Sequence, residues 1–306
     1  MIIIGECIHV ISKDVRKAIE ERNKPFIQDL ARKQVQAGAS IIDLNIGPQK
    51  KAGAEVMPWM VNAIQEVTDV QISLDTTNAV AIEAGIQACK RTPIINSTDA
   101  TPERLNALMP LAAKYKTQII ALTLASGGLP TSADMRIQLA SENIFPSAAQ
   151  YGVETPNILL DPLVLTVNGN QDQAIQTVEA TRFFKQMADP PPLTTCGLSN
   201  ISNSCPPEGR PLLNRVFLVM MMAAGLDTVI ADPFDTKLME AVRILDKRDD
   251  STPKGKLYLA IYDAYQAGAE FDASGVNMND PELSEIVKTE RVLANKTLYA
   301  HSYAKL

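Results

Sequence analysis

KPFIQDLARKQVQAGASIIDLN, residues 24–45, contains one complete helix-to-strand unit, and units of this kind recur along the chain. Residues 24–37 place apolar side chains on one helical face, and Gly38 suits the left-handed residue that ends many helices. The apolar run 41–45 has the length of a buried strand and ends at the polar Asn45. The stretch therefore predicts a helix over 24–37 followed by a strand over 41–45.

Working outward from this unit, short apolar runs alternate with segments of helical period to the end of the sequence. The predicted strands are Ile2–Gly5, Ile41–Asn45, Ile72–Leu74, Pro93–Asn96, Gln118–Thr123, Ile158–Asp161, Leu193–Leu198 and Thr228–Ala231. The predicted helices cover 24–37, 53–66, 78–90, a segment that opens at Thr101–Pro102, 132–150, 171–188, 211–224 and 235–247.

Eight strands, each followed by a helix, predict an α/β fold of the (β/α)8 TIM barrel type. An open doubly wound sheet would more often carry GxGxxG after its first strand, and the sequence has no such motif. We expect a single barrel domain over 1–306, with a helical insertion at about 236–280. The apolar residues of 257–265 require a covering surface, which is either the last helices of the chain or a dimer or partner interface.

The composition is that of a folded globular protein, with 46% apolar and 21% charged residues among 306. The net charge of −6 disfavours nucleic acid as a partner, and no run is rich in Lys and Arg. The opening MIIIGECIHV lacks the basic start and the long apolar run of a signal peptide, and no later stretch has the length of a membrane span. We therefore expect a cytoplasmic protein with no membrane contact.

Metal-binding patterns are weak. The four cysteines, Cys7, Cys89, Cys196 and Cys205, show no CxxC spacing, and the only histidines are His9 and His301. Structural zinc and iron–sulfur sites usually need three or four such ligands at short spacing. No protein-bound metal is expected.

Polar residues end the apolar runs, and in a barrel of this kind the carboxyl ends of the strands face the active site. These strand-end residues are Glu6, Asp43, Asn45, Asp75, Asn96, Asp161, Ser199, Asn200 and Asp232. At any one position an Asp or Asn can simply cap a helix or form an Asx turn. A whole ring of acids and amides favours instead a neutral heterocycle rich in N–H donors, because carboxylates accept paired hydrogen bonds from an amino-pyrimidine. A phosphate ester would require Arg, Lys or helix N-termini.

Motifs at these positions resemble those of the pterin-binding barrel family, and most of all its methyltetrahydrofolate:corrinoid protein methyltransferases. The motifs are MIIIGE, IIDLNIGP, ISLDTTN, IINST, ILLDPLVL, GLSNIS and RPLLNR, which run in the family's order from Met1 to about Asp235. The tail TERVLANKTLYAHSYAKL is similar to the family's last helix.

The resemblance implies roles for individual residues. Residues matching Asp75, Asn96 and Asp161 hold the pterin in the family, and Asn200 matches an Asn beside N5, so it is the expected catalytic residue. Arg210 matches an Arg near the mouth, toward the folate tail. Glu6, Asp43, Asn45 and Ser199 are expected to complete the substrate-binding set.

The implied reaction moves a methyl group between N5 of tetrahydrofolate and the cobalt of cobalamin on a partner corrinoid protein. It serves O-demethylation or the acetyl-CoA pathway in such enzymes, and the resemblance also implies a homodimer. The alternative is a barrel similar to dihydropteroate synthase, or a folate-binding barrel without catalysis. Against the synthase, Asn200–Ile201 replaces its Arg–Lys pair. Against the methyltransferase pattern, Cys7 stands in place of an Arg and His9 in place of an Asn.

Overall fold

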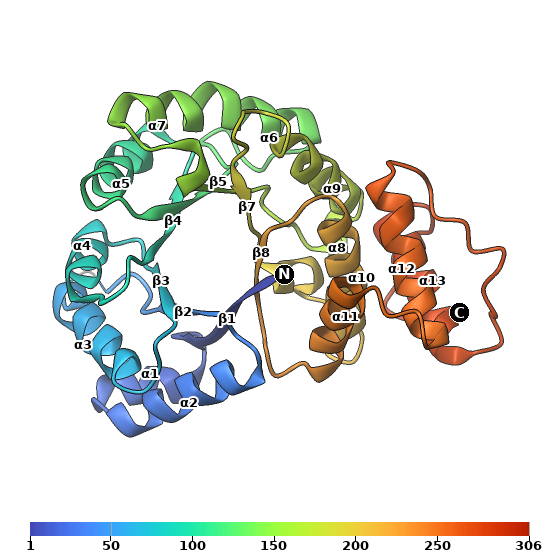
Figure 1. Cartoon of the computed structure of the whole chain (residues 1–306), viewed down its shortest axis with the longest axis horizontal. Helices are drawn as coiled ribbons and strands as arrows, with labels where there is room; N and C mark the ends of the chain where they lie inside the picture. Colours follow the sequence, from blue (N-terminus) through green and yellow to red (C-terminus); the bar gives the residue numbers. More distant parts are fainter. Residues whose placement is uncertain (50, 306) are drawn as a thin grey trace.

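A computed structural model describes residues 1–49 and 51–305, and within them eight parallel strands form a barrel surrounded by helices (Figure 1). The strands are β1 (Ile2–His9), β2 (Ile41–Asn45), β3 (Gln71–Asp75), β4 (Ile94–Asp99), β5 (Gln118–Leu122), β6 (Ile158–Asp161), β7 (Leu193–Thr194) and β8 (Thr228–Ala231). The helices are α1 (Lys13–Glu20), α2 (Lys24–Ala37), α3 (Gly53–Gln65), α4 (Ala79–Ala88), α5 (Pro102–Tyr115), α6 (Ala133–Leu139), α7 (Phe145–Tyr151), α8 (Val167–Asn170), α9 (Asp172–Phe184), α10 (Arg210–Ala223), α11 (Thr236–Lys247), α12 (Pro253–Gln266) and α13 (Pro281–Leu293). The α/β barrel expected from the sequence is confirmed.

Helix ends in the structure follow local side-chain chemistry. Asn78 accepts hydrogen bonds from the first backbone N–H groups of α4, and Asp235 does the same for α11. Gly38 ends α2 with φ of 114°, a left-handed conformation that costs glycine little. These caps fix where each helix begins or ends, and so they fix the loops between helices and strands.

Strands pair in the order β7-β6-β5-β4-β3-β2-β1-β8, which leaves β7 and β8 to close the barrel. They meet through a parallel bridge between Gly197 and Ile230, and the Ile230 N–H donates to the Cys196 carbonyl at 2.9 Å. The predicted strand Leu193–Leu198 is therefore too long. Regular pairing stops at Thr194, because the chain beyond it turns into a 3-10 helix over Leu198–Ser202.

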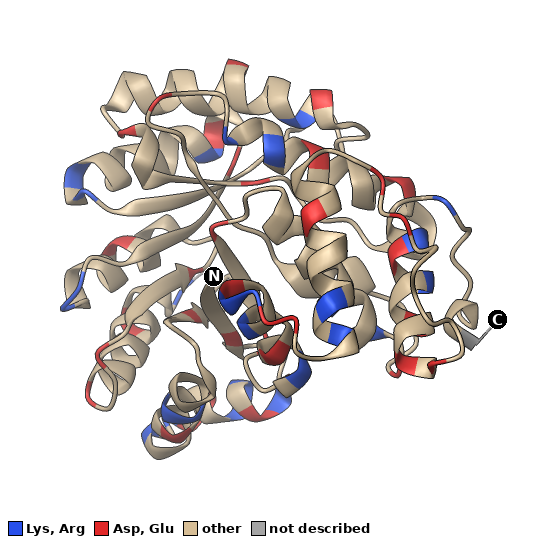
Figure 2. Ribbon diagram, turned by 45° about the vertical axis from the view of Figure 1, so that its right-hand side comes forward, with Lys and Arg blue, Asp and Glu red and all other residues tan. Residues whose placement is uncertain are grey.

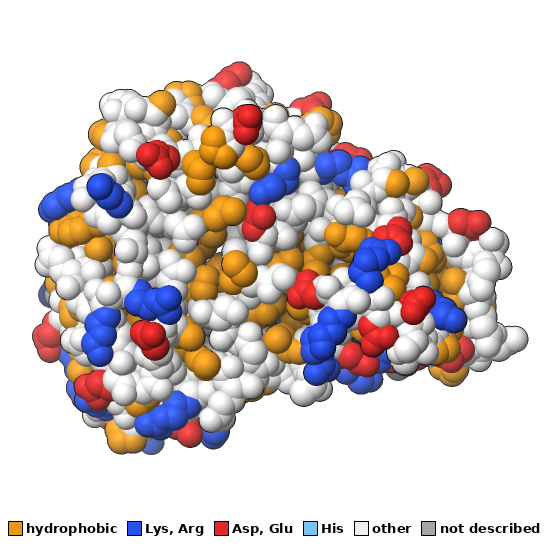
Figure 3. Space-filling view, viewed as in Figure 1, with side chains coloured by type: hydrophobic (Ala, Val, Ile, Leu, Met, Phe, Trp, Pro, Cys, Tyr) orange, Lys and Arg blue, Asp and Glu red, His pale blue; other side chains and the backbone are white. Residues whose placement is uncertain are grey.

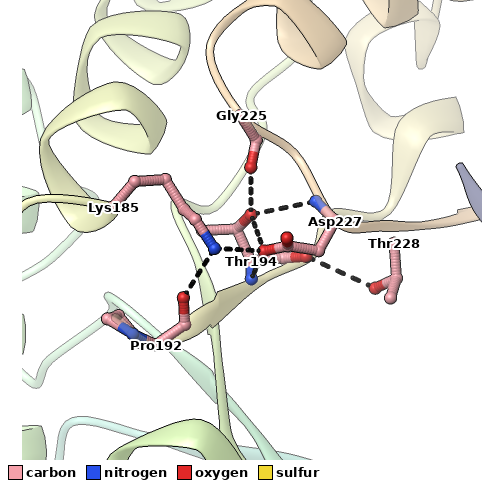
Figure 4. Close-up of polar contacts among 6 residues, drawn as sticks. All are labelled: Lys185, Pro192, Thr194, Gly225, Asp227 and Thr228. Carbon is pink, nitrogen blue, oxygen red and sulfur yellow. Dashed lines mark hydrogen bonds and ion pairs between the residues drawn. The ribbon is translucent and has the colours of Figure 1, made fainter. Parts of the chain in front are cut away.

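A side-chain network supports this seam at the amino ends of β7 and β8 (Figure 4). One carboxylate oxygen of Asp227 accepts hydrogen bonds from Lys185 Nζ at 2.7 Å, Thr194 N at 2.8 Å and Thr194 Oγ1 at 2.9 Å. The Gly225 carbonyl lies 3.0 Å from Thr194 Oγ1 and shares the single hydroxyl proton of Thr194 with Asp227. Because β7 is only two residues long, these side-chain hydrogen bonds replace part of the backbone pairing that a longer strand would supply.

Inside the barrel, five strands each contribute one buried side chain to an apolar cluster made of Ile4, Ile41, Ile94, Ile120 and Leu159. Several of these residues stand at or near the first position of their strand. They fill the barrel toward the amino ends of the strands, as expected for a packed TIM-barrel core. Space for a ligand therefore lies at the opposite, carboxyl end of the strands.

Helices α12 and α13 lie outside the barrel wall beside α10 and α11 (Figure 1). Leu257, Leu259, Ile261 and Tyr265 of α12 are buried in the same apolar cluster as residues of α10 and α13. The apolar residues of 257–265 are therefore covered by other helices of the same chain, which is the first of the two alternatives expected from the sequence. That 236–280 is an insertion into the barrel stays a prediction.

Charged side chains of both signs are spread over the helices (Figure 2), and on the face shown in Figure 3 they are interspersed around the periphery. None of the helices in 1–49 and 51–305 combines the length and the apolar character needed to cross a membrane.

Candidate functional site

The predicted strand-end residues lie toward the carboxyl ends of the strands or just after them, although Glu6 and Asn96 fall inside β1 and β4. Strand β2 carries Asp43 and ends at Asn45, β3 ends at Asp75 and β6 ends at Asp161. Asn96 lies inside β4, which runs further than predicted because its register against β5 shifts just after Ile95. Such bulges re-aim side chains and are frequent beside active sites.

Asp43 is the centre of a buried polar group that joins three strands. Its Oδ1 accepts a hydrogen bond from Ser73 Oγ of β3 at 2.6 Å and another from Asn96 Nδ2 of β4 at 2.9 Å. All three side chains are buried. Burial raises the pKa of Asp43, against the lowering effect of the two hydrogen bonds.

Asn45 and Asp75 form a second pair beside this group. Asn45 Nδ2 donates to the Asp75 carboxylate, and Asn45 Oδ1 accepts from the Gly47 N–H at 2.9 Å. The pKa of Asp75 is raised by burial and then by the charge of Asp43, while the Asn45 hydrogen bond lowers it. The two neighbouring carboxylates therefore favour holding a proton or a ligand N–H near them.

Glu6 sits in a bulge of β1, because three steps of β1 from Gly5 to Ile8 match two steps of β2. Ser199 Oγ donates to Glu6 Oε2 at 3.4 Å. Burial, followed by the charge of Asp232, raises the pKa of Glu6 to about 7. This carboxyl group thus changes its charge near neutral pH.

Cys7 occupies the other bulge position. Its Sγ donates to Asp232 Oδ1 at 3.3 Å, and its backbone N–H donates to Gln34 Oε1 at 3.0 Å. Burial and the Asp232 carboxylate raise the pKa of the Cys7 thiol. The side chain is accordingly a neutral hydrogen-bond donor rather than a thiolate nucleophile.

Asp161 ends β6 with almost no solvent exposure. One carboxylate oxygen accepts from the Leu163 N–H at 2.8 Å. Burial raises the pKa of Asp161 to about 6, while the Leu163 N–H, the charge of Arg136 and the Gly197 N–H lower it. Asp161 is therefore largely ionised at neutral pH despite its burial.

Asn200 lies in the 3-10 helix Leu198–Ser202 after β7 and is exposed. Its Oδ1 accepts from Asn203 Nδ2 at 3.3 Å, which leaves the carboxamide N–H group available to donate. Arg210 at the start of α10 donates from Nε to Ser202 Oγ at 3.2 Å and from Nη2 to Asn203 Oδ1 at 3.5 Å. Arg210 thus braces the loop that carries Asn200.

A cavity of about 760 Å³ opens between the ends of β1, β7 and β8 and the first turns of α10 and α11. Glu6, Ser199 and Arg210 of the predicted set line it. It is also lined by Asp232, Phe234, Arg215 and Lys237, among others. The mouth therefore has an acidic, amide-rich side at β2 to β6 and a side with cations at β7 and β8.

The alternative interpretation of the strand-end residues as Asx turns holds for some of them. Asn45, Asp161 and Asp232 each accept a hydrogen bond from the backbone N–H two residues on. Asp43 and Asp75 instead bond side chains of neighbouring strands. Turn formation uses one oxygen of each carboxylate, so it does not remove Asp161 or Asp232 as ligand-binding groups.

Sequence reasoning missed several contributors. Ser73 stands two residues before Asp75, so the alternation of side chains along a strand places both on the same face of β3 and is the signal that could have indicated it. Arg215 and Lys237 line the mouth because the first turns of α10 and α11 converge there, which no local pattern indicates. Arg136 was hidden inside a predicted helix without any motif. Over the described ranges 1–49 and 51–305, no group of three or more His, Cys, Asp or Glu side chains is arranged to hold a metal ion.

Two named proteins show sequence similarity to most of this chain. A methylcorrinoid:tetrahydrofolate methyltransferase of Eubacterium limosum is 28% identical over 248 residues, which are 80% of this chain and 90% of the relative. A methionine synthase of Mycobacterium tuberculosis is 30% identical over 240 residues, 75% of this chain, although the match spans only 20% of that longer protein.

Solved structures share the fold. A dihydropteroate synthase of Yersinia pestis superposes with a TM-score of 0.60 at 17% identity, covering 81% of this chain and 92% of the enzyme. A dihydropteroate synthetase with a bound product gives 0.59 at 19% identity, over 81% and 93%. The family described as pterin binding enzyme matches residues 13–232, which is well over half of the sequence. The chain therefore belongs to the pterin binding enzyme family.

Proposed function

We propose that this protein moves a methyl group between N5 of tetrahydrofolate and the cobalt of cobalamin carried on a corrinoid protein. The observation that carries the proposal is the set of carboxylates at the mouth, Glu6, Asp43, Asp75 and Asp161. Among the described residues none of them forms an ion pair with Lys or Arg within 4.0 Å. Buried and half-buried acids that are not directly paired with a cation favour a neutral ligand that presents several N–H donors.

The pterin ring meets this requirement. Its 2-amino and N3 groups form a paired donor edge, which Asp161 would accept at the end of β6. Asp75 and Asn96 would bind the rest of the ring from β3 and β4, because the Asp43 and Asn45 contacts already hold both side chains in place. Preorganised polar groups of this kind avoid part of the ordering cost of binding.

Methyl transfer is a displacement at carbon. In one direction the electron pair of reduced cobalt forms the new bond to the methyl carbon, and the N5–carbon pair stays on N5. In the other direction the N5 lone pair attacks the methyl group, and the pair of the broken bond returns to cobalt. The protein's task is to align N5, the methyl group and cobalt, and to stabilise the charge change on N5.

Asn200 is proposed to donate a hydrogen bond to N5 that strengthens in the transition state. A carboxamide is too weak an acid to give up a proton, so a proton for N5 would arrive from water, through a network that includes Asp43 or Asn45. The cavity at β7 and β8 would take the anionic tail of the folate, with Arg210 and Lys237 as the cations that face its carboxylates.

The similarity to the Eubacterium limosum protein, named for both methylcorrinoid and tetrahydrofolate, supports this choice over a synthase. The deciding experiment incubates the purified chain with methyltetrahydrofolate and free reduced cobalamin, and follows the cobalt absorbance. Formation of methylcobalamin, and methylation of tetrahydrofolate in the reverse assay, is expected. Tight folate binding without transfer would instead indicate a folate-binding barrel. Condensation of a pterin pyrophosphate with p-aminobenzoate would indicate a synthase.

A further inference from the structure

Arg136 in α6 is a cation with no exposure to solvent. Its guanidinium group donates to four neutral acceptors: the Pro162 carbonyl at 2.5 Å, the Ser132 carbonyl at 3.1 Å, Gln173 Oε1 at 3.0 Å and the Leu163 carbonyl at 3.3 Å. Among the residues the structure describes, no carboxylate lies within 4.0 Å of its guanidinium nitrogens. A fully buried charge is costly, so its retention at this place calls for an explanation.

Two of the four acceptors are the carbonyls of Pro162 and Leu163, the residues that directly follow Asp161. Leu163 has φ of 58°, a left-handed conformation that is unfavourable for a residue with a Cβ. Its carbonyl is bound by Arg136, and its N–H is bound by the Asp161 carboxylate at 2.8 Å. Arg136 and Asp161 therefore hold the same residue from its two sides.

Charge links the two side chains as well. The groups that favour the ionised form of Asp161 are the Leu163 N–H, the Arg136 guanidinium and the Gly197 N–H. Arg136 is the one full charge in that set. Burial, and then the charges of Asp161 and Glu6, raise the pKa of the Cys196 thiol, so this thiol is neutral.

We propose that Arg136 is a positioning residue for pterin binding: it fixes the Asp161–Leu163 turn through the Pro162 and Leu163 carbonyls and places a buried positive charge beside that turn. The inference rests on the proposed function, in which Asp161 accepts hydrogen bonds from the pterin. It assigns a role to a side chain that does not itself reach the ligand.

The test compares tetrahydrofolate binding by calorimetry between pH 5.5 and 8.5 for the wild type, Arg136→Gln and Arg136→Lys. Without the charge, the midpoint at which affinity falls with decreasing pH should move up by about one pH unit or more. Lys keeps the charge but not the planar fork, so Arg136→Lys should keep the midpoint and lose affinity about tenfold. Other mouth carboxylates titrate in the same range, and hence the difference between variants is the readout.

Arg182→Gln is the matched control, because Arg182 in α9 also donates to a backbone carbonyl, that of Tyr265, away from the mouth. It should leave both midpoint and affinity unchanged. An unchanged midpoint in folded Arg136→Gln overturns the charge role. If that variant does not fold, wild-type affinity in Arg136→Lys overturns the positioning role.

Failure of the proposed function has a different signature. If folate binds without methyl transfer, the comparison of binding midpoints above still decides the inference; if the function fails because tetrahydrofolate is not a ligand, the wild type itself does not bind it. The inference is then decided without ligand, by a carbon-13 NMR titration of Asp161 in the wild type and Arg136→Gln. An upward shift of the Asp161 midpoint in the variant supports the inference, and an identical titration overturns it.

Discussion

Asn96 Nδ2 donates a 2.9 Å hydrogen bond to Asp43 Oδ1, and this bond joins β4 to β2 across the top of β3. Ser73 of the intervening strand donates to the same oxygen at 2.6 Å. The two donors fix the Asp43 carboxylate, and the bond from Asn96 in turn sets its carboxamide so that Nδ2 faces Asp43. One buried acid thus organises three neighbouring strand ends.

Replacing Asn96 by Ala should weaken tetrahydrofolate binding by about 1 to 3 kcal/mol, because the change removes a proposed ligand contact and takes one of its two side-chain donors from Asp43. Calorimetry at pH 7.5 measures the effect. Asn106→Ala is the control, since Asn106 bonds the Tyr151 hydroxyl on the outer helices. Equal tetrahydrofolate affinity of the two variants would show that Asn96 does not contribute to binding.

The Asp161→Asn variant is nearly isosteric but presents donors where the pterin edge also donates. We expect a loss of about 1 to 3 kcal/mol in tetrahydrofolate binding, owing to this mismatch. The variant should also lose the pH dependence that belongs to Asp161. Unchanged affinity in calorimetry would contradict its assignment as the acceptor of the pterin's amino edge.

For Asn200→Ala we expect a far larger loss in rate than in binding. The hydrogen bond to N5 is proposed to strengthen in the transition state, where such contacts contribute on the order of 1 to 4 kcal/mol. Single-turnover methyl transfer to free cobalamin and separate binding measurements give the two quantities. Equal losses in affinity and in kcat/KM would show a ground-state contact instead.

Glu6 predicts a pH-dependent stability of the ligand-free protein. Its pKa is raised from an ordinary 4.5 to about 7, so the folded state binds more protons than the unfolded state between these values. Stability must therefore fall as pH rises from 4.5 through about 7, and level off above it. Glu6→Gln should reduce this fall by on the order of 1 to 3 kcal/mol. Urea unfolding at pH 5 and 8 measures it, and identical slopes in both proteins would contradict the assignment.

The seam between β7 and β8 should be sensitive to Asp227. Asp227→Ala removes the acceptor of three hydrogen bonds and leaves Lys185 without its carboxylate partner, so it should cost about 2 to 4 kcal/mol in unfolding free energy. Removing Asp263, which forms an exposed pair with Arg248, should have no measurable effect. Similar denaturation midpoints for the two variants would show that the network does not support the seam.

Several elements could be read from local sequence because their signals are local. The strands Ile41–Asn45, Ile158–Asp161 and Thr228–Ala231 have the predicted bounds, since each is an apolar run bounded by turn-forming or polar residues. The helix Lys24–Ala37 also agrees, because its Gly38 cap acts within one turn. Where pairing partners decide, prediction was less accurate. Strand β7 ends early at Thr194, and β4 continues past Asn96 through a bulge, because register depends on the neighbouring strand.

The sequence by itself determined the alternation of strands and helices, and with it the barrel and the acidic strand ends, since both follow from chain order and the period of apolar residues. Only the tertiary structure decided which of these acids lie together and in what state. Asp43 meets Asn96 from a strand two places away, and Arg136 of α6 binds the two carbonyls that follow Asp161. Burial and the approach of distant segments set the protonation of these carboxyl groups, and neither can be predicted from local sequence.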